Sequence, residues 1–244
     1  EAAVLQTADE LLVTSLKTKT LFSELTSTPI SVLTNGFDFE ISSGTPLDSK
    51  FTLSHIGSLF EGRNPSVLWK VLSDFIKESE DFAETFQLNL IGSVSTEVLD
   101  TLCSYGLENY ISNLGYMSHN EVLEYQKKTQ LLLLIEENSK ETEYIIPGKL
   151  FEYLNANRPI VALGPEQSDI PSILYDTHTG LYFNYEDKNA IKTHMLHLFG
   201  EYKKNNNVTI LQTNRWNNIL ERAFAKGEQI GLSKEFVTKY FDAV

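Results

Sequence analysis

The chain has 244 residues, of which 41% are apolar, and its formal net charge is −13. This length and apolar content suffice for one large or two small globular domains with a buried core. The negative charge disfavours nucleic acid and anionic membrane surfaces as partners, because their phosphate groups would be repelled. It does not exclude a nucleotide, since helix N-termini and a few local cations are enough to bind one.

The single cysteine and the first residue bear on where the protein works and on how complete the chain is. Cys103 is the one cysteine, so no internal disulfide can form, and we expect a reducing, cytoplasmic compartment. Cys103 follows Val98 and Leu102 at helical spacing, and we interpret it as a small core residue. Because the chain begins with Glu1 rather than methionine, we interpret it as a fragment or a processed product.

The first 50 residues contain few elements of regular structure. A helix end and a short strand are expected between Ala8 and Ser15, and residues 41–48 have the Gly, Ser and Pro content of a linker. Residues 1–40 therefore contain too little regular structure to form a domain of their own.

Strand and helix patterns alternate from about Phe51 to Phe199. The expected strands are 51–57, 86–90, 110–115, 131–135, 160–164 and 181–184. The expected helices begin at Asn64 (N-cap) with Pro65, near Val98, at Ser118 with Glu121 as a capping box, at Pro147 and near Glu186. This alternation predicts an α/β fold with a doubly wound parallel sheet over residues 41–200, followed by a helical C-terminal extension over 201–244.

Ligands of such sheets bind beyond the carboxyl ends of the strands, so the loops there are the places to look for function. The strongest pattern lies after Pro147, where Lys149, Glu152 and Tyr153 share one face of a helix that begins at this edge. Lys149 and the helix N-terminus would attract a diphosphate, and Glu152 could accept hydrogen bonds from both hydroxyls of a ribose. The alternative is an ordinary exposed ion pair between Lys149 and Glu152.

A second pattern follows the first strand of the sheet. Gly57 and Ser58 would let a ligand approach the backbone, and Arg63 could bind a phosphate. Turn geometry alone would also explain the glycines here, and no GxGxxG sequence is present. Glu136 and Glu137 could meet a substrate or belong to a solvated loop.

The histidines give weaker patterns. His194 and His197 are three residues apart on a helix, but no third ligand is evident, so we expect surface histidines and no metal. His55 lies in a strand, where we expect it to be packed or hydrogen-bonded.

These stretches together resemble a known family. Residues 51–200 resemble the C-terminal, donor-binding domain of family 4 glycosyltransferases, which have the GT-B fold of two Rossmann-like domains. Residues 9–38 resemble the end of that family's N-terminal, acceptor-binding domain, which implies that residues 1–40 are the remnant of that domain and its hinge. The matching stretches are 55–59 with 62–63, 90–92, 114–118, 131–135, and 148–154 followed by 158–161.

The resemblance implies transfer of a sugar from a nucleotide-diphosphate sugar to a hydroxyl of a glycan or small-molecule acceptor, with no metal and no cofactor. It leaves the catalytic residues unknown and leaves open a peripheral association with a membrane through the missing N-terminal half. Tyr144 stands where the family often has an acid, eight positions before the ribose glutamate. The implied nucleotide contacts are Gly57, Ser58, Arg63, Tyr116, Met117, Lys149 and Glu152, and the implied contacts to the donor sugar are Glu143, Tyr144 and Gly148.

The last part of the chain has a resemblance of its own. From Phe199 onward it resembles the middle of an all-helical chorismate mutase, in which the positions of Lys203, Gln212 and Arg215 would contact a dicarboxylate substrate. The alternative is a helical extension that packs on the sheet domain. For the whole chain, the alternatives to a glycosyltransferase are a nucleotide-sugar epimerase or hydrolase on the same plan, a binding module without turnover, and a chorismate isomerase confined to the tail.

Overall fold

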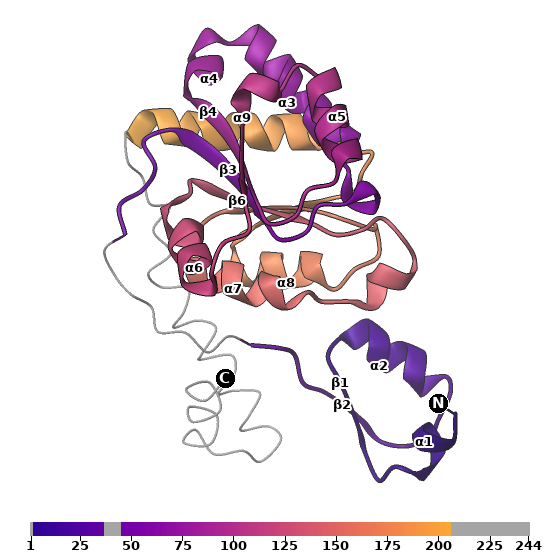
Figure 1. Cartoon of the computed structure of the whole chain (residues 1–244). Coiled ribbons are helices and arrows are strands. Elements are labelled where there is room, and N and C mark those ends of the chain that lie inside the picture. The colour runs from indigo at the N-terminus through magenta and orange to yellow at the C-terminus, as the bar shows by residue number, and fades with distance from the viewer. Residues whose placement is uncertain (1, 37–44, 206–244) are drawn as a thin grey trace.

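A computed structural model describes residues 2–36 and 45–205, and the centre of its main body is a six-stranded sheet, around which the helices are arranged as Figure 1 shows. Every neighbouring pair of strands in this sheet is parallel, in the order β5-β4-β3-β6-β7-β8. The strands are β3 (Phe51–Ile56), β4 (Phe86–Ile91), β5 (Ile111–Gly115), β6 (Leu131–Ile135), β7 (Ile160–Leu163) and β8 (Gly180–Phe183). All six strands expected from the sequence are confirmed, with ends that differ by no more than a few residues.

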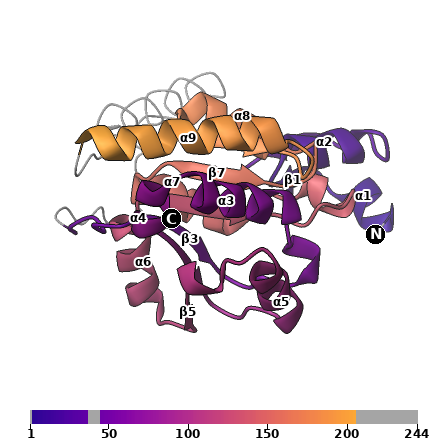
Figure 2. The same cartoon turned by 90° about the horizontal axis from the view of Figure 1, so that it is seen from above.

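Helices cover both faces of the sheet (Figures 1 and 2). One hydrophobic cluster joins the sheet to α3 (Ser66–Glu78), α4 (Glu80–Thr85), α5 (Thr96–Ser104) and α9 (Lys188–Asn205). A second cluster, on the opposite face, joins it to α6 (His119–Lys128), α7 (Gly148–Ala156) and α8 (Ile170–Thr177). Short 3-10 turns are η1 (Glu61–Arg63), η2 (Glu108–Tyr110) and η3 (Glu141–Tyr144). The doubly wound α/β fold is therefore confirmed.

The central strand β6 shows why the sequence folds in this way. All five of its residues are buried. Leu131, Leu133 and Ile135 pack in one cluster, whereas Leu132 and Leu134 pack in the other. A strand that is covered by helices on both faces has to be apolar on both, which accounts for the uninterrupted run of apolar residues.

The strand order creates a switch point between β3 and β6. From β3 the chain adds β4 and then β5 on one side, after which it returns to add β6, β7 and β8 on the other. The loops that follow β3 and β6 therefore diverge to opposite faces of the sheet. A crevice forms at such a point, outside the carboxyl ends of the strands, and ligands of open α/β sheets bind there.

The N-terminal segment forms a small unit of its own, with α1 (Ala2–Thr7), β1 (Leu11–Val13), α2 (Leu16–Ser23) and β2 (Ile30–Val32). Strands β1 and β2 pair in parallel. The start of α2 contacts the main body, because the hydroxyls of Ser15 and Thr18 donate to the carbonyl of Tyr144 at 3.0 and 3.2 Å. The backbone N–H of Lys17 donates to the carboxylate of Asp169 at 3.0 Å. The strand was expected, whereas α2 and β2 were not.

Two local predictions are wrong. Pro65, not Asn64, is the N-cap of α3, because the Asn64 side chain instead accepts from Trp69 Nε1 at 2.7 Å and donates to Thr101 at 2.9 Å. Cys103 is exposed rather than part of the core, because Val98 and Leu102 occupy the buried face of α5.

Helix α9 continues without a break past position 200, where the sequence placed the end of the sheet domain. Within the described residues, no helix is both long and apolar enough to span a membrane.

Candidate functional site

Gly57 directly follows β3 at the switch point, and the candidate site lies around it. Its φ angle is 127°, a value that favours glycine. A Cβ atom at Gly57 would lie 2.0 Å from the Nζ atom of Lys149. Behind it, a Cβ atom at Gly92 would lie 2.6 Å from the carbonyl oxygen of Gly57. The absence of side chains at these two positions thus lets Lys149 lie directly over the backbone at the end of β3.

Lys149 comes from the first turn of α7. Pro147 is the N-cap of this helix and no side chain caps it, so N–H groups of the first turn are available to a ligand. Lys149 forms no ion pair with any described residue, and neither does Arg63. The alternative of an exposed ion pair between Lys149 and Glu152 is therefore wrong, because Lys149 turns toward Gly57 and Glu152 has a different partner.

Burial controls the charges of this site. It lowers the pKa of Lys149, an effect that nearby Glu136 opposes and nearby Arg63 reinforces. Glu136, at the end of β6, is 5% exposed, and burial raises its pKa while Arg63 and Lys149 act to lower it. Glu136 is thus buried near Lys149 and Arg63, whereas Glu137 is exposed. The solvated-loop alternative therefore fits Glu137 and does not fit Glu136.

His55 lies at the same strand end and contributes no charge. It is 1% exposed, and burial, followed by the field of Lys149, lowers its pKa to about 3. Its Nδ1 lies 3.1 Å from the carbonyl oxygen of Leu133, which can only accept, so Nδ1 carries the proton. Nε2 has no hydrogen-bond partner among the described residues. The expectation of a packed, hydrogen-bonded histidine is confirmed.

Glu152 lies one turn after Lys149 on α7 and is half-buried. Its Oε2 accepts a hydrogen bond from Gln126 Nε2 of α6 at 2.8 Å. The sequence patterns did not single out Gln126. The available signal was its position four residues after Val122, where the apolar stripe of α6 continues with a polar residue.

Tyr153 does not lie on the exposed face of α7 with Lys149 and Glu152, as the sequence predicted. It is completely buried, and its hydroxyl accepts from the N–H of Ile56 at 3.1 Å and lies 3.4 Å from the carbonyl of Leu133. The pairing of β3 with β6 ends at His55 and Leu133. Tyr153 therefore satisfies backbone groups that the sheet leaves unpaired at its carboxyl edge.

The remaining predicted contacts differ in how far they are exposed. Ser58 is exposed, Tyr116 is 91% exposed, and Met117 packs partly buried against the α6 and α7 side of the core. A Cβ atom at Gly148 would meet nothing within 4 Å, so a ligand can approach the start of α7 closely. Glu143 and Tyr144 lie half-buried in η3, with the carbonyl of Tyr144 facing α2.

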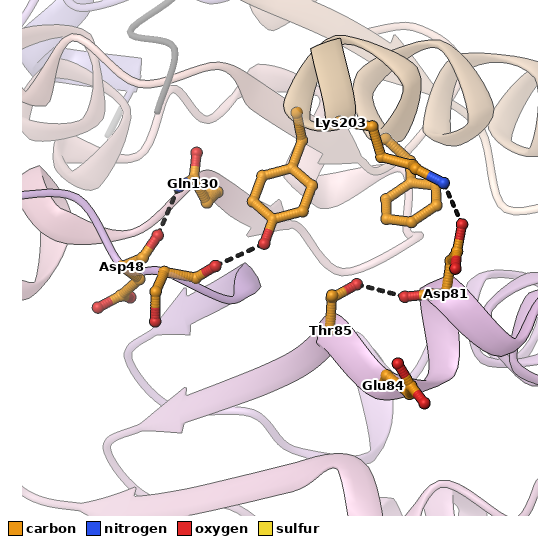
Figure 3. Close-up of a pocket in the computed structure, with 9 residues that line it drawn as sticks. Asp48, Asp81, Glu84, Thr85, Gln130 and Lys203 are labelled. Carbon is orange, nitrogen blue, oxygen red and sulfur yellow. Dashed lines mark hydrogen bonds and ion pairs between the residues drawn. The ribbon is translucent and has the colours of Figure 1, made fainter. Parts of the chain in front are cut away.

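A separate cavity of about 440 Å³ lies at the opposite edge of the sheet, near the amino ends of β3, β4 and β6 (Figure 3). Asp48, Asp81 and Glu84 line it together with Lys203, whose ammonium group pairs with Asp81. The surplus of carboxylates makes this cavity unsuited to a diphosphate or a dicarboxylate. Lys203, a predicted contact of the mutase-like tail, is thus already paired, while Gln212 and Arg215 lie outside the described residues.

His194 and His197 do not assemble a metal site. His194 is partly buried, and burial lowers its pKa to about 4, whereas His197 is exposed. The part of the chain that the structure describes contains no group of three or more histidine, cysteine or acidic side chains placed to hold a metal ion.

Comparison with known proteins gave one family match. Residues 193–244 match the model of chorismate mutase type II. This match begins inside α9, and the buried residues Met195, Leu198 and Phe199 of that stretch belong to the core of the sheet domain. A comparison with curated protein sequences found no match.

Solved structures match the chain at the level of fold. HepE of Anabaena in complex with UDP-glucose has 14% identity and a TM-score of 0.66, covering 97% of this chain and 63% of its own. WaaG, a glycosyltransferase involved in lipopolysaccharide biosynthesis, has 15% identity and a TM-score of 0.63, covering 96% of this chain and 62% of its own. TarM of S. aureus has 13% identity and a TM-score of 0.63, covering 95% of this chain and 42% of its own.

These identities are low enough that the likeness shows the fold alone. The chain spans between 42% and 63% of the length of these three structures. The sheet and its helices therefore have the Rossmann-like fold of a domain of the GT-B glycosyltransferases.

Proposed function

We propose that the chain is the donor-binding part of a glycosyltransferase, which binds the diphosphate of a nucleotide sugar at the switch point of the sheet. The observation that carries this proposal is the position of Lys149, whose ammonium group lies over Gly57 without a carboxylate partner among the described residues. Two half-buried cations beside an uncapped helix N-terminus form a site for an anion with more than one charge. Solved structures of the same fold with bound UDP or UDP-glucose support the choice of a nucleoside diphosphate.

In this proposal, each part of the nucleotide has its own contacts. Lys149, Arg63 and the first N–H groups of α7 neutralise the diphosphate, which lies against the backbone of Gly57 and Ser58. Glu152 accepts hydrogen bonds from the ribose, and Tyr116 and Met117 border the base. The donor sugar extends toward Gly148, Glu143 and Tyr144. Because the protein cations supply the positive charge that the leaving diphosphate requires, the proposal includes neither a metal nor a cofactor.

The acceptor side is assigned to the N-terminal half of the protein, of which residues 1–40 form the remnant and hinge, while 41–200 form the donor domain. Sugar transfer requires donor and acceptor to be held together, and this positioning contributes a large part of the rate enhancement. We place the reaction in the cytoplasm, with a hydroxyl of a glycan or small molecule as acceptor. A second function, chorismate isomerisation by residues 201–244, has only the family match over 193–244 in its support, and we do not favour it.

Calorimetric titration with UDP and GDP tests the proposed site. Glu152→Ala should weaken binding about tenfold or more, because hydrogen bonds to a charged group contribute about 1.5–3 kcal/mol each. Lys149→Ala should also weaken binding, by a factor that shrinks as the salt concentration rises.

Two substitutions on exposed helix faces serve as matched controls. Glu124→Ala and Lys70→Ala remove a carboxylate and an ammonium group of weak surface ion pairs and should leave binding unchanged. The assignment fails if the wild type binds a nucleotide and Glu152→Ala binds it equally well.

A further inference from the structure

Gln126 is a buried amide that joins the two helices next to the candidate nucleotide site. It lies on α6 and is 1% exposed, and its Nε2 donates to Oε2 of Glu152 on α7 at 2.8 Å. No residue among 2–36 and 45–205 donates a hydrogen bond to the second carboxylate oxygen of Glu152, Oε1. Among the described residues, the carboxylate of Glu152 is thus hydrogen-bonded through Oε2 alone.

The chemistry of the amide suits a carboxylate that has to remain an acceptor. An amide N–H orients a carboxylate without neutralising it, whereas a lysine or arginine at the same place would compete with a ligand for its charge. One carboxylate offers about four acceptor directions, of which Gln126 uses one. The rest remain available to two neighbouring hydroxyl groups.

Burial makes this orientation persistent. If Glu152 turned away, the amide of Gln126 would be left without its acceptor in a position closed to water, which is unfavourable. Helix α6 is itself fixed at its start, where the N–H and the hydroxyl of Ser118 donate to Glu121 at 2.9 and 2.6 Å. The same helix start directly follows Tyr116 and Met117, so one rigid element carries both the loop proposed for the base and the amide that holds Glu152.

We propose that Gln126 is a positioning residue for the ribose: it fixes the carboxylate of Glu152 so that Oε1 and the remaining lone pair of Oε2 accept the 2′- and 3′-hydroxyls of the nucleotide. This inference rests on the proposed function. The competing explanation is that the contact between Gln126 and Glu152 serves only to pack α6 on α7.

The experiment compares the full 244-residue wild type with Gln126→Met, which keeps the length of the side chain and removes its donor. The probes are UDP, GDP, their 2′-deoxy forms and inorganic pyrophosphate, titrated by calorimetry. Gln126→Met should lower the affinity for the preferred ribonucleotide about tenfold, lower that for the deoxy form by less, and leave that for pyrophosphate unchanged.

Gln130 provides a matched control at the other edge of the sheet. It is 7% exposed, and its amide donates to the carbonyl of Asp48 at 2.6 Å. Gln130→Met removes another buried donor, far from the site, and should leave all affinities unchanged. Gln126→Leu, which has a similar size and no donor, should repeat the hydroxyl-specific loss if Gln126→Met folds poorly.

The possible outcomes distinguish a failure of this inference from a failure of the proposed function on which it rests. If the wild type binds no nucleoside diphosphate, both fail. If Glu152→Ala weakens binding and Gln126→Met and Gln126→Leu do not, the positioning role is overturned and the proposed function stands. An equal loss for pyrophosphate would show a general structural role and would also overturn it. In the expected case, the double variant Gln126→Met/Glu152→Ala binds no more weakly than Glu152→Ala alone.

Discussion

Lys149 and Gly57 are in direct apposition, since a methyl group on the glycine would lie 2.0 Å from the lysine ammonium nitrogen. The two residues are far apart in the sequence, yet the position of each depends on the other. The lysine needs the open backbone, and the backbone needs a residue that tolerates a φ angle of 127°.

Gly57→Ala should therefore reduce both stability and diphosphate binding. The strained φ angle should cost about 1–3 kcal/mol of unfolding free energy, and displacement of Lys149 should weaken the binding of UDP, GDP and pyrophosphate about tenfold or more. Urea unfolding and calorimetric titration measure the two effects.

Gly106→Ala is the matched control for this substitution. Gly106 has a φ angle of 73°, and an added Cβ atom there would meet nothing within 4 Å. It should lose stability and keep the affinity of the wild type. Equal affinities of Gly57→Ala and wild type would contradict the placement of the diphosphate.

Because His55 is buried and neutral, we expect the folded protein to lose stability in acid. The pKa of His55 is lowered from 6.5 to about 3, by burial first and by Lys149 second. Below about pH 6.5 the unfolded chain takes up a proton on this residue that the folded chain does not accept. The stability that neutral His55 contributes is thus complete above pH 6.5 and is lost progressively as the pH falls toward 3.

His55→Asn should reduce this loss of stability between pH 6.5 and 3, because an asparagine amide can donate to the carbonyl of Leu133 without titrating. Unfolding free energies measured by urea between pH 3 and 8 would show this change. The control is His197→Asn at an exposed position, which should leave the pH dependence of stability as in the wild type. Superimposable pH profiles for His55→Asn and wild type would rule out a buried neutral histidine as the cause.

The chain by itself should bind a UDP- or GDP-sugar weakly and should not transfer the sugar. It spans 42% to 63% of the length of the structures that it matches, and transfer requires the acceptor to be held against the donor. A radiolabelled donor incubated with glycan and small-molecule acceptors measures transfer directly. Transfer by the purified chain that disappears in Glu152→Ala would refute this prediction.

The tail should show no chorismate mutase activity. Lys203 is paired with Asp81, and Phe199, from the same stretch, is 8% exposed in the core of the sheet domain. Both residues therefore already serve the sheet domain. Spectroscopic assay of the conversion of chorismate to prephenate tests this, and activity that is lost in Arg215→Ala would show the prediction to be wrong.

The sequence was sufficient to predict the six strands and their parallel arrangement, because buried parallel strands are apolar on both faces and end at glycines such as Gly57 and Gly92. It was also sufficient to propose Lys149, Arg63 and Glu152 as neighbours at one sheet edge. The structure brings Lys149, Arg63 and Glu136 within electrostatic reach of one another.

Other features depend on contacts that have no local signature. Tyr153 was assigned to the wrong face of α7, because the unpaired backbone groups at Ile56 and Leu133 become visible only once β3 and β6 are paired. Gln126 follows no motif, since its partner lies 26 residues away on another helix. Helix α2 was missed because none of its residues is buried, so it lacks the apolar stripe from which helices are predicted.

The contacts of α2 have a consequence for the order of folding. Ser15 and Thr18 find their acceptor 129 and 126 residues further along the chain, and Lys17 finds its acceptor 152 residues away. Chains are synthesised from the N-terminus, so this helix leaves the ribosome well before η3 and α8 exist. Closing loops of this length is slow relative to local contacts. The segment that is made early is therefore expected to be docked late, after the sheet has formed the surface that receives it.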